Sequence, residues 1–251
     1  MINANYELRY VAFLDLLGFK KMVILSGGDQ NILNKINMAL SYIGNMQHNN
    51  YNGITSMSEL GKHVTSFSDS IVISYDTSMP GGGFYVLMDL VYICNDLLGI
   101  GIPVRGGVTV GQLIHNKQKC FGPAMIEAYL MESQKALFPR IIIDQKVLEY
   151  DLSKPGEANT IEYEAEYLNA IIKKDPLDEL LFLDYMKQYN EFDEPEIYDD
   201  YILRTREFII KNLNIHAYNE KLYKKYEWLK WYYNETITTV YSHMEQLYIK
   251  E

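Results

Sequence analysis

Two aspartates and one arginine occupy apolar or glycine-rich surroundings where each needs a chemical or structural reason. Asp15 ends the apolar run at residues 8–14, and an isolated carboxylate at the end of a buried strand is costly. Asp69 lies at the tip of an expected hairpin, and Arg105 lies among the glycines of residues 103–111. Two carboxylates at one sheet edge are hard oxygen ligands that suit Mg²⁺ or Mn²⁺. The pattern therefore indicates a divalent-cation site beside an arginine.

A glycine follows the first of these acids. Gly18 permits a tight turn, so that main-chain N–H groups can face an anion. Each residue also has an ordinary structural explanation: Asp15 could cap a strand end, Asp69 could be a turn former, and Arg105 could pair with a surface acid. The combination in this order favours the cation site.

The elements that must position these residues alternate along the first 145 residues. Apolar runs and alternation predict strands at residues 8–14, 63–67, 70–76, 103–113 and 140–144. Helices are expected over residues 30–47, capped by Asp29, over 84–98, and from Pro123 to about Lys135. The order β-α-β-β-α-β with an added α-β predicts an α+β, ferredoxin-like or palm fold, with helices on one face of a mainly antiparallel sheet.

The last hundred residues differ in composition. Residues 151–200 contain three prolines and an acidic stretch, and the chain reads as helical from about residue 199. An apolar stripe at steps of three and four runs from Leu222 to Leu247. A helix that covers the core is the simpler interpretation, and a dimer-forming helix is the alternative. We divide the chain into a catalytic domain, 1–150, and a mostly helical C-terminal extension, 151–251.

Composition limits the partners. The 251 residues carry a net charge of −10 and 48% hydrophobic residues, enough for a core of one domain with or without an appendage. An acidic chain repels long nucleic acid, whereas bound cations can reverse the charge locally for a nucleotide. Two cysteines without metal-ligand spacing fit a reducing compartment. No signal peptide or membrane-length apolar stretch is visible, so we expect a cytoplasmic protein without stable membrane association.

These motifs resemble the catalytic domain of class III nucleotidyl cyclases over about the first 145 residues. The family's strand–Asp–x–x–Gly–Phe motif is matched at residues 15–19, and its hairpin acid is matched by Asp69. Its Arg-x-Gly-x-x-x-Gly strand is matched from Arg105, and its aromatic–Gly pair before a helix ending in MES is matched at Phe121.

The resemblance implies a two-metal site and a homodimer. It implies that Asp15, Asp69 and the carbonyl of Leu16 hold two Mn²⁺ or Mg²⁺ ions, and that the backbone from Leu16 through Gly18 to Phe19 cradles phosphates. In the family the site forms between two subunits.

The base-reading positions depart from the purine cyclases. Thr65 stands where those enzymes have a lysine, Lys119 where they have an acid, and Ile126 and Leu130 where they have the transition-state Asn and Arg. Either the enzyme is degenerate or it belongs to a branch with another base preference. The sequence resembles the uridylate and cytidylate cyclases of bacterial Pycsar antiphage systems in runs such as FLDLLGF, FSDSIVIS and FPRIIID.

This second resemblance implies a lyase that cyclises UTP, or less favourably CTP, to the 3′,5′-cyclic monophosphate with release of pyrophosphate, in antiphage defence. Thr65 and Lys119 would then contact the base, and Arg105 would supply catalytic charge. Arg140 would reach the triphosphate or pair with Glu132. The alternatives are a metal- and nucleotide-binding regulatory module without turnover, a purine cyclase, and a palm-type enzyme that joins two nucleotides.

Overall fold

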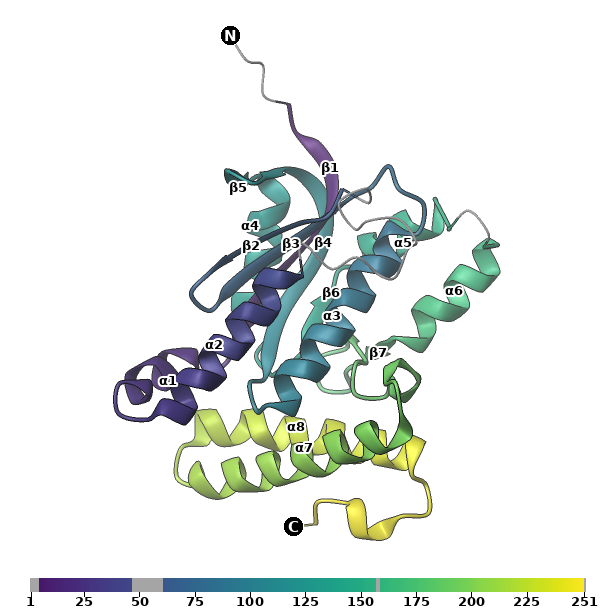
Figure 1. The fold of residues 1–251 in the computed structure, drawn as a ribbon. Helices are drawn as coiled ribbons and strands as arrows, with labels where there is room; N and C mark the ends of the chain where they lie inside the picture. The colour runs from purple at the N-terminus through teal and green to yellow at the C-terminus, as the bar shows by residue number, and fades with distance from the viewer. Residues whose placement is uncertain (1–4, 47–60, 157–158, 251) are drawn as a thin grey trace.

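A computed structural model describes residues 5–46, 61–156 and 159–250 (Figure 1). Its centre is an eight-stranded sheet. The strand order is β2 (His63–Phe67), β3 (Ser70–Asp76), β1 (Glu7–Leu16), β4 (Val104–Asn116), β6 (Ile141–Ile143), β8 (Leu181–Leu183) and β7 (Ile172–Lys174). The short strand β5 (Lys119–Phe121) pairs with β4 outside this path.

The first four strands of that path confirm the α+β, ferredoxin-like prediction. β2, β3, β1 and β4 are antiparallel to one another at each of their three pairings, in the order that two split β-α-β units produce, whereas β6 joins β4 in parallel. The connections carry α1 (Phe19–Ser26) and α2 (Gln30–Asn45) between β1 and β2, and α3 (Gly82–Gly99) between β3 and β4. Asp29 caps α2 as expected, since its carboxylate accepts from the Asn31 N–H at 2.9 Å.

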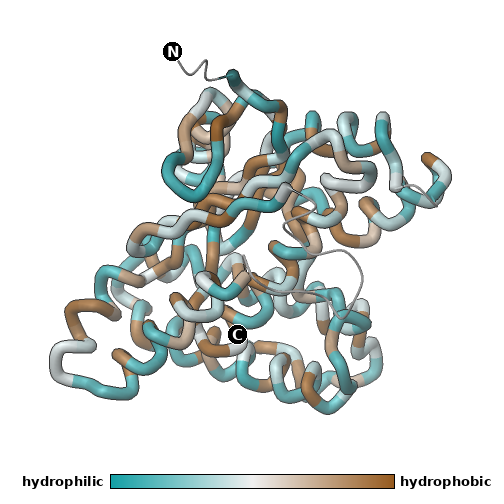
Figure 2. The backbone as a smooth tube through the Cα atoms, turned by 45° about the horizontal axis from the view of Figure 1, so that its top comes forward, coloured by the Kyte–Doolittle hydropathy of each residue, from teal (hydrophilic) through white to brown (hydrophobic). Residues whose placement is uncertain are grey.

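Helices cover both faces of the sheet, so the expectation of one covered face is wrong. Tyr10, Ala12 and Leu14 of β1 pack into the core with α2 and α3. Val11 and Phe13, which alternate with them, pack on the other side with α4 (Pro123–Leu130). The physical reason is that β1 is apolar at consecutive positions, so both of its faces need a cover. Hydrophobic segments accordingly run through the middle of the molecule in Figure 2.

The helix that starts at Pro123 changes its pitch before it ends. Its last turn is η1 (Met131–Lys135), a π-helix, in which five rather than four residues separate hydrogen-bonded groups. The expected single helix to Lys135 is therefore an α-helix followed by a wider turn. α5 (Gln145–Leu152), α6 (Ile161–Ala170) and the short turn η2 (Tyr189–Glu191) follow.

Two long helices close one end of the molecule. α7 (Pro195–Ile215) and α8 (Glu220–Val240) form a hairpin below the ends of α2 and α3 in Figure 1. Tyr201 and Phe208 of α7 lie against Gly99 and Gly101, just before β4. The apolar stripe that predicted one helix to Leu247 is helical only to Val240, and η3 (Glu245–Leu247) lies in the tail beyond it.

The burial of α8 agrees with the simpler interpretation of this stripe. Its side chains Trp228, Leu229, Tyr232, Tyr233 and Ile237 are buried, so the helix covers the core of its own chain. β7 and β8 come from the expected C-terminal extension and continue the sheet through the β6–β8 pair. The division at residue 150 stays a prediction. None of the described helices has the length and apolar character needed to cross a bilayer.

Candidate functional site

The two predicted metal ligands lie at the same end of the sheet. Asp15 pairs in register with Ser70 across β1 and β3, and the N–H of Leu16 donates to the carbonyl of Asp69 at 3.0 Å. Asp69 is half-buried in the turn between β2 and β3, where Ser68 takes a φ of 58°. The side chain of Asp15 is 21% exposed. The structure thus brings together two acids that lie far apart in the sequence and that the sequence analysis selected as metal ligands.

Arg105 joins this end of the sheet from the other side of β1. It pairs in register with Asp15 across β1 and β4. Its Nε donates to Asp15 Oδ2 at 3.1 Å and also lies 2.7 Å from Oε1 of Glu132. Because Nε carries one hydrogen, which is directed at Asp15, Oε1 of Glu132 has an ionic contact but no aligned hydrogen bond.

Glu132 is a site residue that the sequence analysis did not select. It is buried on the π-turn η1. Burial raises the pKa of Glu132, the Arg105 charge opposes that rise, and the carboxylates of Asp15 and Asp69 add to it. The available signal was its position in the MES run, but the expected partner, Arg140, was wrong.

The Gly18 turn has the expected form. Gly18 has a φ of 81° and begins α1, which has no side-chain cap at its N-terminus. A Cβ there would meet nothing within 4 Å, so the backbone conformation rather than space favours glycine. Leu17 N–H donates to the carbonyl of Pro103 at 2.9 Å. Phe19 is buried, so it anchors the helix, while the first N–H groups of α1 have no partner within the helix.

The expected base contacts lie further along the sheet. Thr65 is exposed on β2, and its hydroxyl lies 2.9 Å from Nε2 of His115. His115 also meets Ser74 Oγ through Nδ1 at 2.8 Å. Burial lowers the pKa of His115 to about 4, with smaller contributions from His63 and Arg9, so the imidazole is neutral near pH 7. Lys119 is exposed on β5, next to Cys120, which pairs with His115.

Arg140 does not join this site. Its side chain is fully buried and its guanidinium pairs with Asp175 and Asp178. It also stacks near the rings of Phe138 and Trp228. The expected pair with Glu132 is therefore wrong. Because its charge is already neutralised in the interior, Arg140 is not available to a triphosphate.

The donor set fits a hard divalent cation. Asp15 and Asp69 supply carboxylates, and Leu16, which follows Asp15 at the end of β1, supplies a carbonyl as a third oxygen. Among residues 5–46, 61–156 and 159–250, no three His, Cys, Asp or Glu side chains form a group that could hold a metal. A cation here would therefore complete its shell with backbone, water or substrate oxygens.

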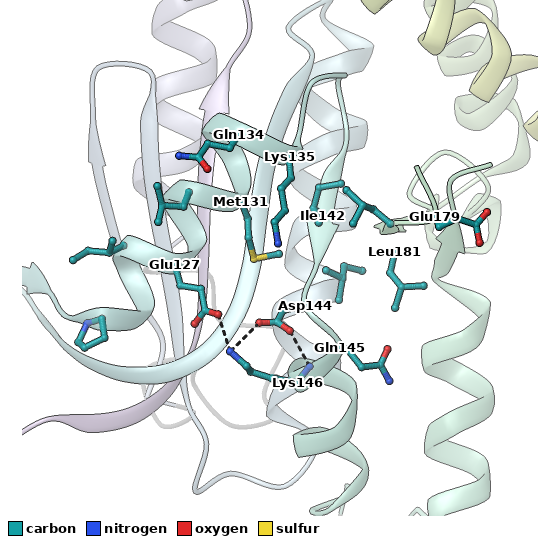
Figure 3. A pocket seen from close by; sticks show the side chains of 15 residues that line it. Glu127, Met131, Gln134, Lys135, Ile142, Asp144, Gln145, Lys146, Glu179 and Leu181 are labelled. Atoms are coloured by element: carbon teal, nitrogen blue, oxygen red, sulfur yellow. Dashed lines mark hydrogen bonds and ion pairs between the residues drawn. The ribbon is translucent and has the colours of Figure 1, made fainter. Parts of the chain in front are cut away.

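A separate cavity of about 800 Å³ lies between α4, η1, β6 and the start of α5 (Figure 3). Met131 and Ile142 contribute apolar walls. At its rim Lys146 pairs with Glu127 at 2.7 Å and with Asp144 at 3.5 Å. Neither acid of the candidate cation site lines it, so the cavity is distinct from that site.

Solved structures of similar fold include three cyclase or cyclase-like proteins. The monomeric guanylyl cyclase domain of the RhoGC fusion protein from Blastocladiella emersonii has 16% identity and a TM-score of 0.44, covering 71% of this chain and 95% of that chain. A bacterial light-regulated adenylyl cyclase has 14% identity and a TM-score of 0.39, and the match covers 60% of this chain and 46% of that chain. A class III adenylyl cyclase-like ATP-binding protein from Pseudomonas aeruginosa has 11% identity and a TM-score of 0.40, covering 65% and 40%.

No family model and no curated protein matches the sequence. At these identities and TM-scores, the likenesses to solved structures carry no argument about chemistry. The functional conclusion rests on the residues at the ends of β1 and β4.

Proposed function

We propose that this protein is a divalent-cation-dependent nucleotide cyclase that converts a pyrimidine nucleoside triphosphate to its 3′,5′-cyclic monophosphate and pyrophosphate. The observation that supports this most is the strand register that gathers Asp15, Asp69 and Arg105 beside the uncapped Gly18 turn. This arrangement combines cation ligands, a cationic side chain and backbone N–H donors at one sheet edge.

The carboxylates of Asp15 and Asp69 and the carbonyl of Leu16 would hold Mn²⁺ or Mg²⁺, two ions per site. Bound there, such ions lower the pKa of the attacking 3′-hydroxyl and neutralise the leaving pyrophosphate. The N–H groups of Leu16 and Leu17 already donate to the carbonyls of Asp69 and Pro103, so those of Gly18 and Phe19 would bind phosphate oxygens at the start of α1.

Arg105 would stabilise the charge that develops on the α-phosphate. When the 3′-oxygen bonds to the α-phosphorus, the bond from that phosphorus to the oxygen bridging to the β-phosphorus breaks, pyrophosphate leaves, and the hydroxyl proton passes to solvent water. A guanidinium aimed at the non-bridging oxygens contributes a few kcal/mol, of the order that such donors give. Glu132, 2.7 Å from Nε, keeps the arginine oriented when a cation engages Asp15.

Thr65 and Lys119 are the proposed contacts to the base. The Thr65 hydroxyl can donate or accept, whereas an ammonium can only donate. A donor suits the O2 and O4 carbonyls of uracil, and cytosine lacks O4, so we propose that UTP is favoured over CTP. Both side chains are exposed, and a base that binds the Thr65 hydroxyl would share it with Nε2 of His115.

A homodimer is part of this proposal. α4 presents an apolar outer face, with Ile126 62% exposed and Tyr129 and Leu130 also exposed. A cavity of about 540 Å³, with Phe13 and Phe121 in its wall, adjoins that face. A second copy would bury these side chains. A cyclic pyrimidine nucleotide made this way would serve as an antiphage signal.

One specific observation favours a second candidate, a regulatory module that binds metal and nucleotide without turnover. Ile126 and Leu130, where purine cyclases place their transition-state Asn and Arg, are exposed apolar side chains. The described structure therefore has no polar group at those two positions.

One experiment separates the candidates. The purified protein is incubated with all four NTPs at equal concentration and with Mn²⁺, and the products are identified by mass. Cyclic UMP, with less cyclic CMP, is the expected result. Absence of any product would favour the regulatory module, and a dinucleotide would indicate a nucleotide-joining enzyme. Dominant cyclic AMP or cyclic GMP would overturn the base assignment while leaving the cation site intact.

A further inference from the structure

The second helix of the C-terminal hairpin turns a lysine toward the protein interior. Trp228 and Leu229 lie on the buried face of α8. Lys225 precedes them by three and four residues, so helical periodicity places it on the same face. It is half-buried, whereas its neighbour Lys224 is exposed and pairs with Glu220 at 2.7 Å on the outer surface.

Aromatic stacking fixes this part of α8 against the segment that follows Glu132. The ring of Trp228 stacks on Phe138 with centroids 5.6 Å apart and planes 3° from parallel. Its Nε1 donates to Asp175 at 2.8 Å. Phe138 lies shortly after η1, the turn that carries Glu132. The face of α8 that bears Lys225 is therefore held close to the carboxylate cluster.

The electrostatic surroundings of Lys225 are those of the candidate active site. Burial lowers the pKa of Lys225, and the charges of Arg105 and Lys221 lower it further, while Asp15 and Glu132 raise it. In return, the Lys225 charge lowers the pKa of Glu132. Charges at the ends of β1, β4 and η1 thus act on a side chain that comes from the far end of the chain.

Lys225 nevertheless has no direct partner within residues 5–46, 61–156 and 159–250. No hydrogen bond, and no carboxylate within 4.0 Å, is found for its ammonium among the residues that the structure describes. Arg105, by contrast, contacts both Asp15 and Glu132. A half-buried ammonium without a counter-ion is unfavourable. An anionic ligand that enters the site would supply the missing counter-charge.

We propose that Lys225 binds the triphosphate of the substrate, which makes the C-terminal helical hairpin part of the active site. This inference rests on the proposed function, because that function supplies the anion. α4 carries no arginine or lysine in residues 123–130, so the cation has to come from another element. α8 supplies it through Lys225, whose charge interacts with those of Asp15 and Glu132.

The test compares Lys225→Met with Lys224→Met. The probe is inorganic tripolyphosphate with Mn²⁺, titrated by calorimetry, which requires neither turnover nor a particular base. We expect Lys225→Met to weaken binding by about tenfold or more, as for loss of a charge-assisted contact. Lys225→Arg should restore most of the affinity, and Lys224→Met should bind as the parent does.

Two further readouts complete the test. Melting temperatures show whether each variant is folded, and Lys225→Gln, which is polar and uncharged, replaces Lys225→Met if the latter melts early. Parent-like binding by a folded Lys225→Met or Lys225→Gln variant would overturn the inference, even if the parent cyclises UTP. If Lys225→Met binds tripolyphosphate more weakly than the parent, but the parent cyclises no NTP, the proposed function is wrong while the role of Lys225 stands. A parent that does not bind tripolyphosphate would contradict both.

Discussion

Nε of Arg105 lies 3.1 Å from Oδ2 of Asp15, so the arginine proposed to act in catalysis is paired with a carboxylate proposed to hold the metal ion. Without a divalent cation the two charges neutralise each other across the β1–β4 pair. A cation that binds Asp15 must compete with this arginine. Glu132 offers the guanidinium a second carboxylate, so cation binding would shift Arg105 from Asp15 toward Glu132. Both contacts are made through Nε, so the terminal nitrogens could bind substrate before and after that shift.

Loss of either metal acid should abolish the reaction without unfolding the protein. We expect Asp15→Asn and Asp69→Asn to lower product formation by about a thousandfold or more, because each removes charge that opposes two cations. Product mass and Mn²⁺ titration are the measurements. Asp76→Asn, at the other end of β3, is the matched control because an amide oxygen can still accept from Ser78. Turnover near the parent rate in either variant would contradict the two-metal assignment.

The protein should be a homodimer whose interface includes α4. Ile126→Asp places a charge on its most exposed apolar side chain and should give monomers that make little product. Light scattering with an activity assay measures both properties. Glu127→Asp, on the same helix, should stay dimeric. An active parent monomer at micromolar concentration would show that the site needs no second copy.

The exposed lysine on β5 should affect the choice between uracil and cytosine. We expect Lys119→Met to reduce the preference for UTP over CTP by about tenfold, since the donor to O4 is lost. The measurement is kcat/KM for both nucleotides. Lys117→Met, in the same hairpin, should leave the ratio unchanged. An unchanged ratio in Lys119→Met would mean that this side chain does not read the base.

Arg140 should matter for stability rather than for substrate binding. Arg140→Met leaves the fully buried Asp175 without its charge partner and should cost about 3–5 kcal/mol in the free energy of unfolding. Urea denaturation measures this. Arg204→Met, which removes an exposed pair with Asp200, should cost about 1 kcal/mol or less. A raised KM in Arg140→Met with unaltered stability would restore the nucleotide-contact interpretation.

A buried carboxyl on α5 should make stability depend on pH. Asp151 accepts from the N–H of Gly83 at 2.7 Å and from the hydroxyl of Tyr10 at 3.3 Å. Burial raises the pKa of Asp151 to about 7, and the charge of Glu164 adds to that rise. Because the folded state holds the proton more tightly, the stabilisation is full below about pH 4 and is lost as the pH rises through 7.

The free energy of unfolding should therefore fall between pH 6 and pH 8, by roughly 1 kcal/mol per pH unit at most. Asp151→Asn should flatten this dependence, because the amide can accept from Gly83 at any pH. Urea titrations at the two pH values are the measurement, with Asp29→Asn at an exposed helix cap as control. A parent-like slope in Asp151→Asn would place the titrating group elsewhere.

Local patterns were enough to predict the sheet around the site. The strands at 63–67 and 70–76 have the bounds that the alternation predicted, because a tight turn and regular alternation are local signals. α1 was missed because its eight residues show no clear amphipathic period. β7 and β8 have three residues each, too few for any period to be visible.

The rest of the site depends on contacts that no local pattern encodes. Glu132 reaches Arg105 from a π-turn, and a helical pattern read at 3.6 residues per turn does not show this change of pitch. The partners of Arg140 come from residues 175–178, in a stretch where the sequence analysis noted only prolines and acidic residues. Lys225 reads as one of several lysines on a helix until the fold shows which face is buried.

The helix pair α7–α8 closes the end of the sheet that carries Asp15, although it is formed by the last quarter of the described chain. During synthesis, β1 to β4 can pair as soon as they leave the ribosome, while the contacts of Phe208 with Gly101 and of Trp228 with Phe138 must wait for nearly the whole chain. A nascent chain with a finished sheet would therefore still lack the lid of its own site. If Lys225 binds the triphosphate as we propose, catalytic activity would come only with the last helix, and incomplete chains would be inactive.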